Sequence, residues 1–218
     1  MTSKRMIPPS PRTFVAGLLH KAFFAFFIVL ILNAPADAAE TLPRTIVERF
    51  QGDLLAVMKE AETLGVRGRY RRLAPVIENS FHISLMIRWA SAPYWKGAGE
   101  DRQNRLRAAF LRMSIATLAT LFDGYSGQTF VFVGESPGPQ RRTRIVETRI
   151  VDPDQSFVAI DYVARKVGDR WFIVDVLVDK GISELTVRRS EYRKVLRDKG
   201  IDGLIATLEA KAGQLLME

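Results

Sequence analysis

The sequence contains no cysteine and only two histidines. Disulfide bonds, thiolate zinc sites and a cysteine nucleophile are therefore excluded. The sequence also lacks a G-x-S-x-G elbow, a Gly-rich phosphate loop, an H-E-x-x-H motif and an EF-hand loop. Because no nucleophile-and-base set remains, a hydrolase is disfavoured. We predict that the protein is not an enzyme, has no catalytic residues and requires no metal or other cofactor.

The N-terminal segment reads as a targeting signal. Ala22–Leu32 is an unbroken apolar run that follows four basic residues and precedes Ala36 and Ala38 in A-x-A spacing. This order is typical of a secretory signal peptide, and we predict residues 1–38 as the signal with cleavage before Ala39. A retained membrane anchor is the alternative. Against it, eleven residues of helix rise about 16 Å, roughly half the thickness of a hydrocarbon core.

The chain is basic, with a net charge of +8, but part of that charge belongs to the signal. Removing residues 1–38 takes away four positive charges and one negative charge, which leaves +5. We therefore do not predict nucleic-acid binding; this excess suits an acidic partner or anionic lipid headgroups. An exported chain without cysteine fits the bacterial periplasm. Residues 39–218 are expected to form a single domain.

Apolar residues at helical spacing predict helices before and after a run of strands. The first helix starts near Pro43 and is expected to end by Gly65 and Gly68. Pro75 is expected near the first turn of the second helix, where proline is tolerated. The remaining helices are predicted at Tyr70–Asn79, Phe81–Ala90, Glu100–Tyr125, Ser183–Lys199 and Asp202–Leu215.

From Gln128 the hydrophobic period changes to two, which is typical of strands. Short turns between the strands imply antiparallel hairpins. The four predicted strands are Thr129–Val133, Arg142–Val151, Ser156–Lys166 and Trp171–Asp179. Strict alternation in the last strand places Phe172, Val174, Val176 and Val178 on one face, and Trp171, Ile173, Asp175 and Leu177 on the other. Both faces are mostly apolar, so we expect other parts of the protein to pack on both of them. The fold class is α+β: a four-stranded antiparallel sheet with helices packed before and after it.

Three features have both a functional and a structural interpretation. Asp161 and Asp175, on neighbouring strands, would form a paired-carboxylate site if they faced each other, although a solvated margin or an arginine partner is more usual. His82 stands in an apolar segment and is more typical of a structural or surface residue. Arg67–Arg72 is expected to be a solvated face, with lipid-headgroup or partner contact as the alternative.

An ordered set of short motifs resembles the MlaC-type (toluene-tolerance) periplasmic lipid carriers. The family shows a W-x-I/V-x-D-V strand, a G-[IV]-S turn and an R-[ST]-x-[FY] helix in this order. The matching segments are Phe81–Met86, Trp95, Leu121–Tyr125, Trp171–Val176, Gly181–Ser183 and Arg189–Tyr192. Arg69–Pro75 is similar to the hopanoid-biosynthesis-associated branch called HpnM. The resemblance covers residues 42–216. It departs at His82, where the family commonly has Asp, and at Pro93-Tyr94, where a small residue is usual.

The resemblance implies an NTF2-like fold that encloses an apolar pocket between sheet and helices. It also implies a shuttle that carries phospholipid or hopanoid between an inner-membrane ABC transporter complex and an outer-membrane partner, with transient membrane contact. Each buried methylene is worth about 0.8 kcal/mol, so acyl chains can drive such binding. The alternative is an exported scaffold or interaction module with a solid core and no ligand, since most apolar stripes are core.

Candidate lipid-lining residues follow from periodicity together with the resemblance. They are Phe81, Met86, Ile87, Phe110, Met113, Tyr125, Tyr162, Trp171, Ile173 and Leu177. Arg88 and Arg142 are candidates for headgroup contact. The arginine-rich segments Arg67–Arg72 and Arg188–Lys199 are candidate docking surfaces for a transporter partner.

Overall fold

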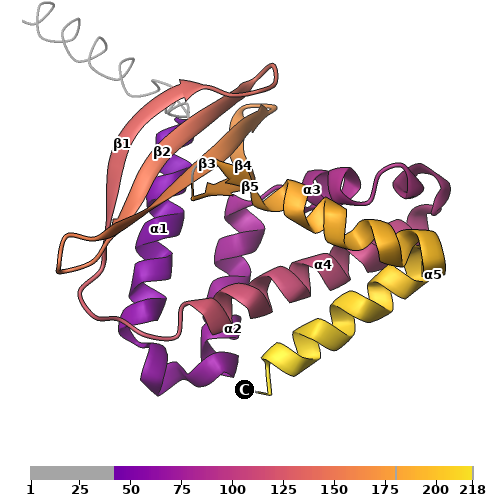
Figure 1. Cartoon of the computed structure of the whole chain (residues 1–218), viewed down its shortest axis with the longest axis horizontal. Coiled ribbons are helices and arrows are strands. Elements are labelled where there is room, and N and C mark those ends of the chain that lie inside the picture. The colour runs from indigo at the N-terminus through magenta and orange to yellow at the C-terminus, as the bar shows by residue number, and fades with distance from the viewer. Residues whose placement is uncertain (1–41, 180, 218) are drawn as a thin grey trace, which may run out of the picture. The chain divides into compact units, whose positions relative to one another are not determined.

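The computed structural model describes residues 42–179 and 181–217, so the predicted signal peptide lies outside the described residues. Helices precede and follow one sheet, as Figure 1 shows. The helices before the sheet are α1 (Pro43–Lys59), α2 (Ala61–Ser80), α3 (Ile83–Ala90), the 3-10 turn η1 (Tyr94–Gly97) and α4 (Glu100–Leu121). The strands are β1 (Thr129–Pro137), β2 (Thr143–Val151), β3 (Phe157–Val167), β4 (Arg170–Val178) and β5 (Ile182–Ser183), followed by α5 (Glu184–Leu215).

The sheet has the order β1-β2-β3-β4-β5 with every pair antiparallel. The predicted α+β class with helices before and after an antiparallel sheet is confirmed. The fifth strand is only two residues long, too short to show an alternating pattern. β1 continues four residues past its predicted end at Val133, because a bulge there keeps the following residues paired with β2.

A second bulge changes the faces of β4. Val163 pairs with Asp175 and Ala164 pairs with Ile173, which leaves Val174 without a partner in β3. The predicted alternation along this strand is therefore wrong beyond Ile173, since one extra residue reverses the side on which all later residues stand. Trp171 and Ile173 share a face with Val176 and Val178, whereas Leu177 lies on the opposite face.

The inner face of the sheet, defined here as the face carrying Thr148 and Tyr162, packs against α1. Figure 1 shows the sheet arching over this helix. The Phe50 ring meets Phe81 and Tyr162 edge-on, with centroids 5.0 Å and 5.9 Å apart. Gln51 Nε2 donates to Thr148 Oγ1 at 2.9 Å, and Gln51 also hydrogen-bonds the buried Tyr162 side chain. Satisfied polar groups within an apolar interface favour one position of α1 on the sheet.

Glycines break two of the helices. In α2 the backbone leaves helical geometry at Gly65 (φ +56°), and in α5 it does so at Gly200 (φ +64°). The break predicted at Gly200 is confirmed, whereas Gly68 lies within α2 rather than ending a helix. Pro75 also lies in the interior of α2, so its placement near a first turn was wrong. Pro75 is exposed, where water can replace the donor that proline lacks. None of the described helices combines the length and apolar character needed to cross a bilayer.

Arg69 is an exception to the solvated face expected for the arginine-rich segment. Its side chain is buried; Nε donates to the Ala119 carbonyl at 2.6 Å and Nη1 to the Ala61 carbonyl at 2.9 Å. Ala119 lies in the last turn of α4, where carbonyls lack helical donors and a positive charge is favourable. Arg69 therefore joins α2 to the end of α4.

The Arg69→Met substitution should lower the free energy of unfolding by about 2–3 kcal/mol, because it removes two buried charge-assisted hydrogen bonds and leaves two carbonyls without them. Urea unfolding followed by tryptophan fluorescence measures this loss. Arg71→Met is the matched control: Arg71 is exposed on the same helix, and its substitution should change stability by less than about 0.5 kcal/mol. Equal losses in the two variants would contradict the structural role of Arg69.

Candidate functional site

His82 caps α3. Its Nδ1 accepts a hydrogen bond from the Leu85 amide at 3.2 Å, its own amide donates to the Ile173 carbonyl at 2.9 Å, and its ring lies 5.3 Å from that of Phe172. Aspartate is a preferred N-cap residue because it too offers a side-chain acceptor to the first turn. The departure from the family pattern at this position therefore keeps the capping function.

Asp175 holds the beginning of α5. One carboxylate oxygen accepts from the Leu185 amide at 3.0 Å and from its neighbour Val176 at 2.9 Å, and the other accepts from Ser183 Oγ at 2.6 Å. Ser183 in turn caps the helix by accepting from the Thr186 amide. These contacts explain why the D-V strand and the G-I-S turn occur together: the first supplies the carboxylate and the second the helix start that it stabilises.

Asp161 and Asp175 do not form a joint acid–base site. Asp161 stands opposite Leu177 and accepts from the Thr148 amide at 3.1 Å, whereas Asp175 stands opposite Val163 and binds the start of α5. Each carboxylate therefore has its own structural partner. Within the described ranges, no cluster of three or more His, Asp or Glu side chains could hold a metal ion.

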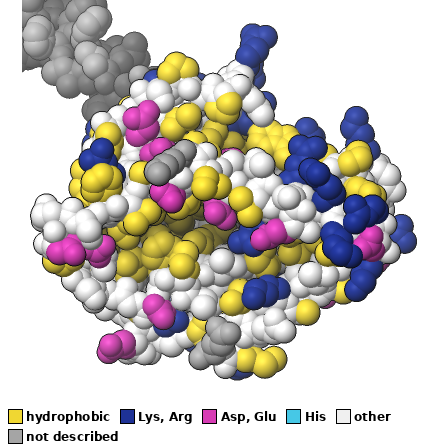
Figure 2. Space-filling model, in the orientation of Figure 1, with side chains coloured by type: hydrophobic (Ala, Val, Ile, Leu, Met, Phe, Trp, Pro, Cys, Tyr) yellow, Lys and Arg dark blue, Asp and Glu magenta, His cyan; other side chains and the backbone are white. Residues whose placement is uncertain are grey.

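A groove of about 660 Å³ lies on the outer face of the sheet, opposite α1. This volume falls within the range of small-molecule sites, about 300–1,000 Å³. Figure 2 shows hydrophobic side chains between the sheet and the first turns of α5, with Lys and Arg side chains beside them. The apolar lining residues include Trp89, Pro137, Pro139, Ile145, Val163, Val174, Leu177 and Leu185.

Three parts of the fold form the walls of this groove. The sheet supplies its floor through the outward residues of β2, β3 and β4; the β1–β2 hairpin and the end of α3 supply two sides, and the first turns of α5 supply another. Arg165 connects two of these walls. It donates from Nη1 to Gln140 Oε1 at 3.1 Å, and its guanidinium lies 5.9 Å from the Trp89 ring centroid.

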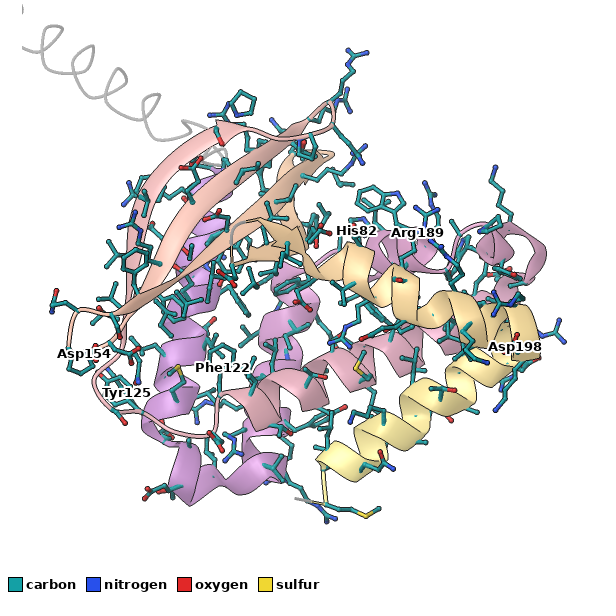
Figure 3. All side chains as sticks on the ribbon, in the orientation of Figure 1. His82, Phe122, Tyr125, Asp154, Arg189 and Asp198 are labelled. Atoms are coloured by element: carbon teal, nitrogen blue, oxygen red, sulfur yellow. The ribbon has the colours of Figure 1, made fainter. Side chains whose placement is uncertain are left out.

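The polar lining side chains are Gln140, Thr143, Asp175, Ser183, Thr186 and Arg189, of which Asp175 and Arg189 are charged. The Asp175 carboxylate is occupied by the start of α5, as described above. Arg189 has no hydrogen bond or ion pair with any of the described residues. Figure 3 shows Arg189 on the first half of α5, which contacts α3. The groove is thus mainly apolar and carries one positive charge, that of Arg189, without a partner among the described residues.

Among the predicted lipid-lining residues, the structure places Leu177 in this groove. Tyr125 is 40% exposed, with Lys59 Nζ 5.4 Å from its ring centroid, and Met86 and Trp171 are partly buried against the core. The other candidates are core residues, each at most 8% exposed: Phe81, Ile87, Phe110, Met113, Tyr162 and Ile173. The headgroup candidates Arg88 and Arg142 are exposed and immediately precede the lining residues Trp89 and Thr143.

Arg189 was predicted as part of the docking segment Arg188–Lys199 and of the motif Arg189–Tyr192, and not as a lining residue. In that motif the arginine lines the groove and Tyr192 is buried in the core. The Tyr192 hydroxyl has no hydrogen-bond partner within the part of the chain that the structure describes, which explains why the family motif allows either Phe or Tyr there. The motif spacing was therefore the available signal for Arg189.

The two arginine-rich segments differ in how their charges are paired. In Arg67–Arg72, Arg72 pairs with Glu60, and Arg67 donates to the Leu216 carbonyl. In Arg188–Lys199 three side chains pair within the helix, Arg188 with Glu191, and Lys194 and Arg197 with Asp198. Figure 2 shows Lys and Arg side chains gathered over α3 and the first half of α5. Surface pairs of this kind contribute little to stability.

Partial burial raises the pKa of Asp161, and the neighbouring Glu147 charge acts in the same direction. The fold favours the protonated form of this carboxyl. Its contribution to stability is therefore fully present below the ordinary aspartate pKa of 3.8 and is lost as pH rises through the raised pKa. Asp161→Asn keeps the acceptor for the Thr148 amide, and at pH 7 this variant should be at least as stable as the wild type. Its stability relative to that of the wild type should increase from pH 4 to pH 7.

Thermal unfolding across this pH range measures the effect. The exposed Asp53→Asn variant controls for the loss of one negative charge. A variant at Asp161 that loses stability relative to the wild type as pH rises would show that the ionised carboxylate is favoured by the fold.

Comparison with known proteins agrees with this architecture. The MlaC protein family model matches residues 48–210, about three quarters of the chain. A solved structure of the phospholipid-binding protein from Ralstonia solanacearum, in complex with a phospholipid, is similar with a TM-score of 0.70. The two sequences are 19% identical, and the match covers 79% of this chain and 98% of that one. This likeness shows a shared fold, and the family match shows that the chain belongs to the MlaC family.

Proposed function

We propose that this protein is a non-catalytic lipid carrier that binds acyl chains in the groove on the outer face of its sheet. The observation that carries the proposal is the groove itself: about 660 Å³, walled mainly by apolar side chains, with one available charge. Membership of the MlaC family and the shared fold with a protein bound to phospholipid support it.

Burial of acyl chains can supply most of the binding free energy at such a site without specific polar contacts. Ten buried methylenes contribute about 8 kcal/mol, comparable with the free energy of a micromolar complex before the costs of association. The side chains that resemble catalytic groups already serve the fold, since His82 caps α3 and Asp175 caps α5. Both considerations favour a carrier over an enzyme.

The cellular role follows from the predicted signal peptide and the family. The carrier would act in the periplasm, receive phospholipid or hopanoid from one membrane-bound complex and deliver it to another. An inner-membrane ABC transporter and an outer-membrane complex are the proposed partners. The positive charges on α3 and the first half of α5, beside the groove, suit transient contact with such complexes or with membrane surfaces.

The interior between sheet and helices is a second candidate location for lipid. Figure 2 shows a hollow with hydrophobic walls below the sheet, between α1 and α2. The core residues predicted to line a pocket belong to this interior, among them Phe81 and Tyr162, both packed on Phe50. A lipid that extended from this hollow to between α1 and the sheet would disturb the Gln51–Thr148 contact, whereas the outer groove takes a lipid without that rearrangement.

Native mass spectrometry of residues 39–218, purified from a host that makes both phospholipids and hopanoids, tests the proposal. We expect a stoichiometric lipid adduct, identified after extraction, because the groove shields acyl chains from water. A protein that is ligand-free on purification and stays empty after incubation with both lipid classes would contradict the carrier function. That result would favour the scaffold alternative, an exported interaction module with a solid core.

A further inference from the structure

We propose that the edge of β1 pairs with β1 of a second copy of the chain, so that the two sheets join in one continuous antiparallel sheet. The partner is therefore the protein itself, in weak and reversible self-association. This inference goes beyond the proposed carrier function. It concerns Thr129–Val133, none of whose residues lines the groove, so either proposal can fail without the other.

The edge of β1 is open to another strand. β1 is the outermost strand in Figure 1, and among the described residues it pairs with β2 alone. About half of the backbone N–H and C=O groups of an edge strand point away from its neighbour. Proteins usually protect such an edge with lysine, with proline or by keeping the strand very short, as in the two residues of β5 at the opposite edge. Thr129–Val133 has none of these protections, and the bulge comes only at its end.

The side chains along this edge are apolar. Val131 and Val133, on the outer face of the sheet, are 44% and 46% exposed. Phe130 and Phe132, on the inner face, are partly buried against the core. No charged residue occurs between Asp123 and Glu135 in the sequence. An uncharged strand of β-branched and aromatic residues favours another apolar strand as its partner.

The order of residues in Thr129–Val133 selects a second copy as that partner. β-branched and aromatic residues alternate, and the order of the two types is the same in both directions. Antiparallel pairing about a two-fold axis at Val131 therefore places like residues opposite each other on both faces, and such pairs stabilise sheets. The resulting pairs are Val131 with itself, Thr129 with Val133, and Phe130 with Phe132.

The charges near the edge do not oppose this pairing. Arg149 stands opposite Val131 on the outer face, so its two copies would be three strand spacings apart, about 14 Å, beyond the screening length of about 8 Å. On the inner face the Arg44 guanidinium lies 4.0 Å from the Phe132 ring centroid and pairs with Glu48 at 2.7 Å. The Arg44 charge is thus compensated within each copy.

The small size of the paired edge makes the association weak. Five residues on one strand edge bury less than the roughly 1,200–2,000 Å² of a stable protein–protein interface. We therefore expect a Kd on the order of 10–100 µM, which is typical of transient association.

The absence of cysteine from the sequence allows a position-specific test. In residues 39–218, Val131→Cys puts one thiol at the two-fold axis, where the paired Cα atoms would be about 4.5–5.5 Å apart, a separation that a disulfide bridges. Mild oxidation should therefore give a disulfide-linked dimer on non-reducing electrophoresis. The matched control is Val158→Cys. Val158 is 45% exposed but lies on β3, so its two copies would be about 24 Å apart, and its dimer should form at least about tenfold more slowly.

A second pair of variants tests the register. Thr129→Cys mixed with Val133→Cys should form disulfide-linked dimers faster than either variant alone, because these two positions stand opposite each other in the proposed pairing. Sedimentation velocity then measures the association itself. The wild type should form more dimer as its concentration rises, and Val131→Lys should weaken dimer formation at least about tenfold, because like charges would face each other at the axis. Val158→Lys should associate as the wild type does.

Four results would overturn the proposal. One is a wild type that stays monomeric well above the expected Kd, with Val131→Cys no faster to cross-link than Val158→Cys. Another is an equal loss of dimer in Val158→Lys, which would place the contact on a different surface. The third is a mixture of Thr129→Cys and Val133→Cys that cross-links no faster than its components. The fourth is a monomer in which the thiol of Val131→Cys is shielded from a maleimide, which would show that the chain covers its own edge. The lipid adduct that tests the carrier function is measured independently of all four.

Discussion

The arrangement of the groove depends on a single residue without a cross-strand partner. Because Val174 is extra relative to β3, Ile173 faces the core between the sheet and α1, while Val174, Asp175 and Leu177 line the outer groove. A strictly alternating strand would have put Ile173, Asp175 and Leu177 on the same side. The bulge thus lets a short strand contribute apolar residues to the closed core and to the open groove.

The same bulge determines where α5 begins. It places the Asp175 carboxylate on the outer face, where it receives the Leu185 amide and the Ser183 hydroxyl. The first turns of α5 are thereby held against the outer face of the sheet, and they supply one wall of the groove and its available arginine. Strand, turn and helix motifs of the family are therefore parts of one structural unit, in which a capped helix adds one wall to the groove on the apolar outer face of the sheet.

Much of this fold could be predicted from local pattern, because helical and strand periodicities are strong in segments such as Glu100–Leu121 and Arg170–Val178. The residues of the groove could not. A bulge depends on how a strand pairs with its neighbour, and the hydrophobic periodicity of the strand does not reveal it. The sequence therefore predicted the wrong faces for the second half of β4. Residue type does not decide between the alternatives either: Phe110 and Met113 suit a lipid pocket and a solid core equally well, and both are buried in the core, so their role as lining residues stays a prediction. Arg189 looked like one of many surface cations, since only the fold shows which of them lines the groove.

The most direct test of the proposed lipid site is a crystal structure of residues 39–218 together with any lipid that co-purifies from the host. The acyl chains should lie along Ile145, Val163 and Leu177, with the Gln51–Thr148 contact intact. Acyl chains found between α1 and the inner face of the sheet, with the outer groove empty, would contradict lipid binding in the groove.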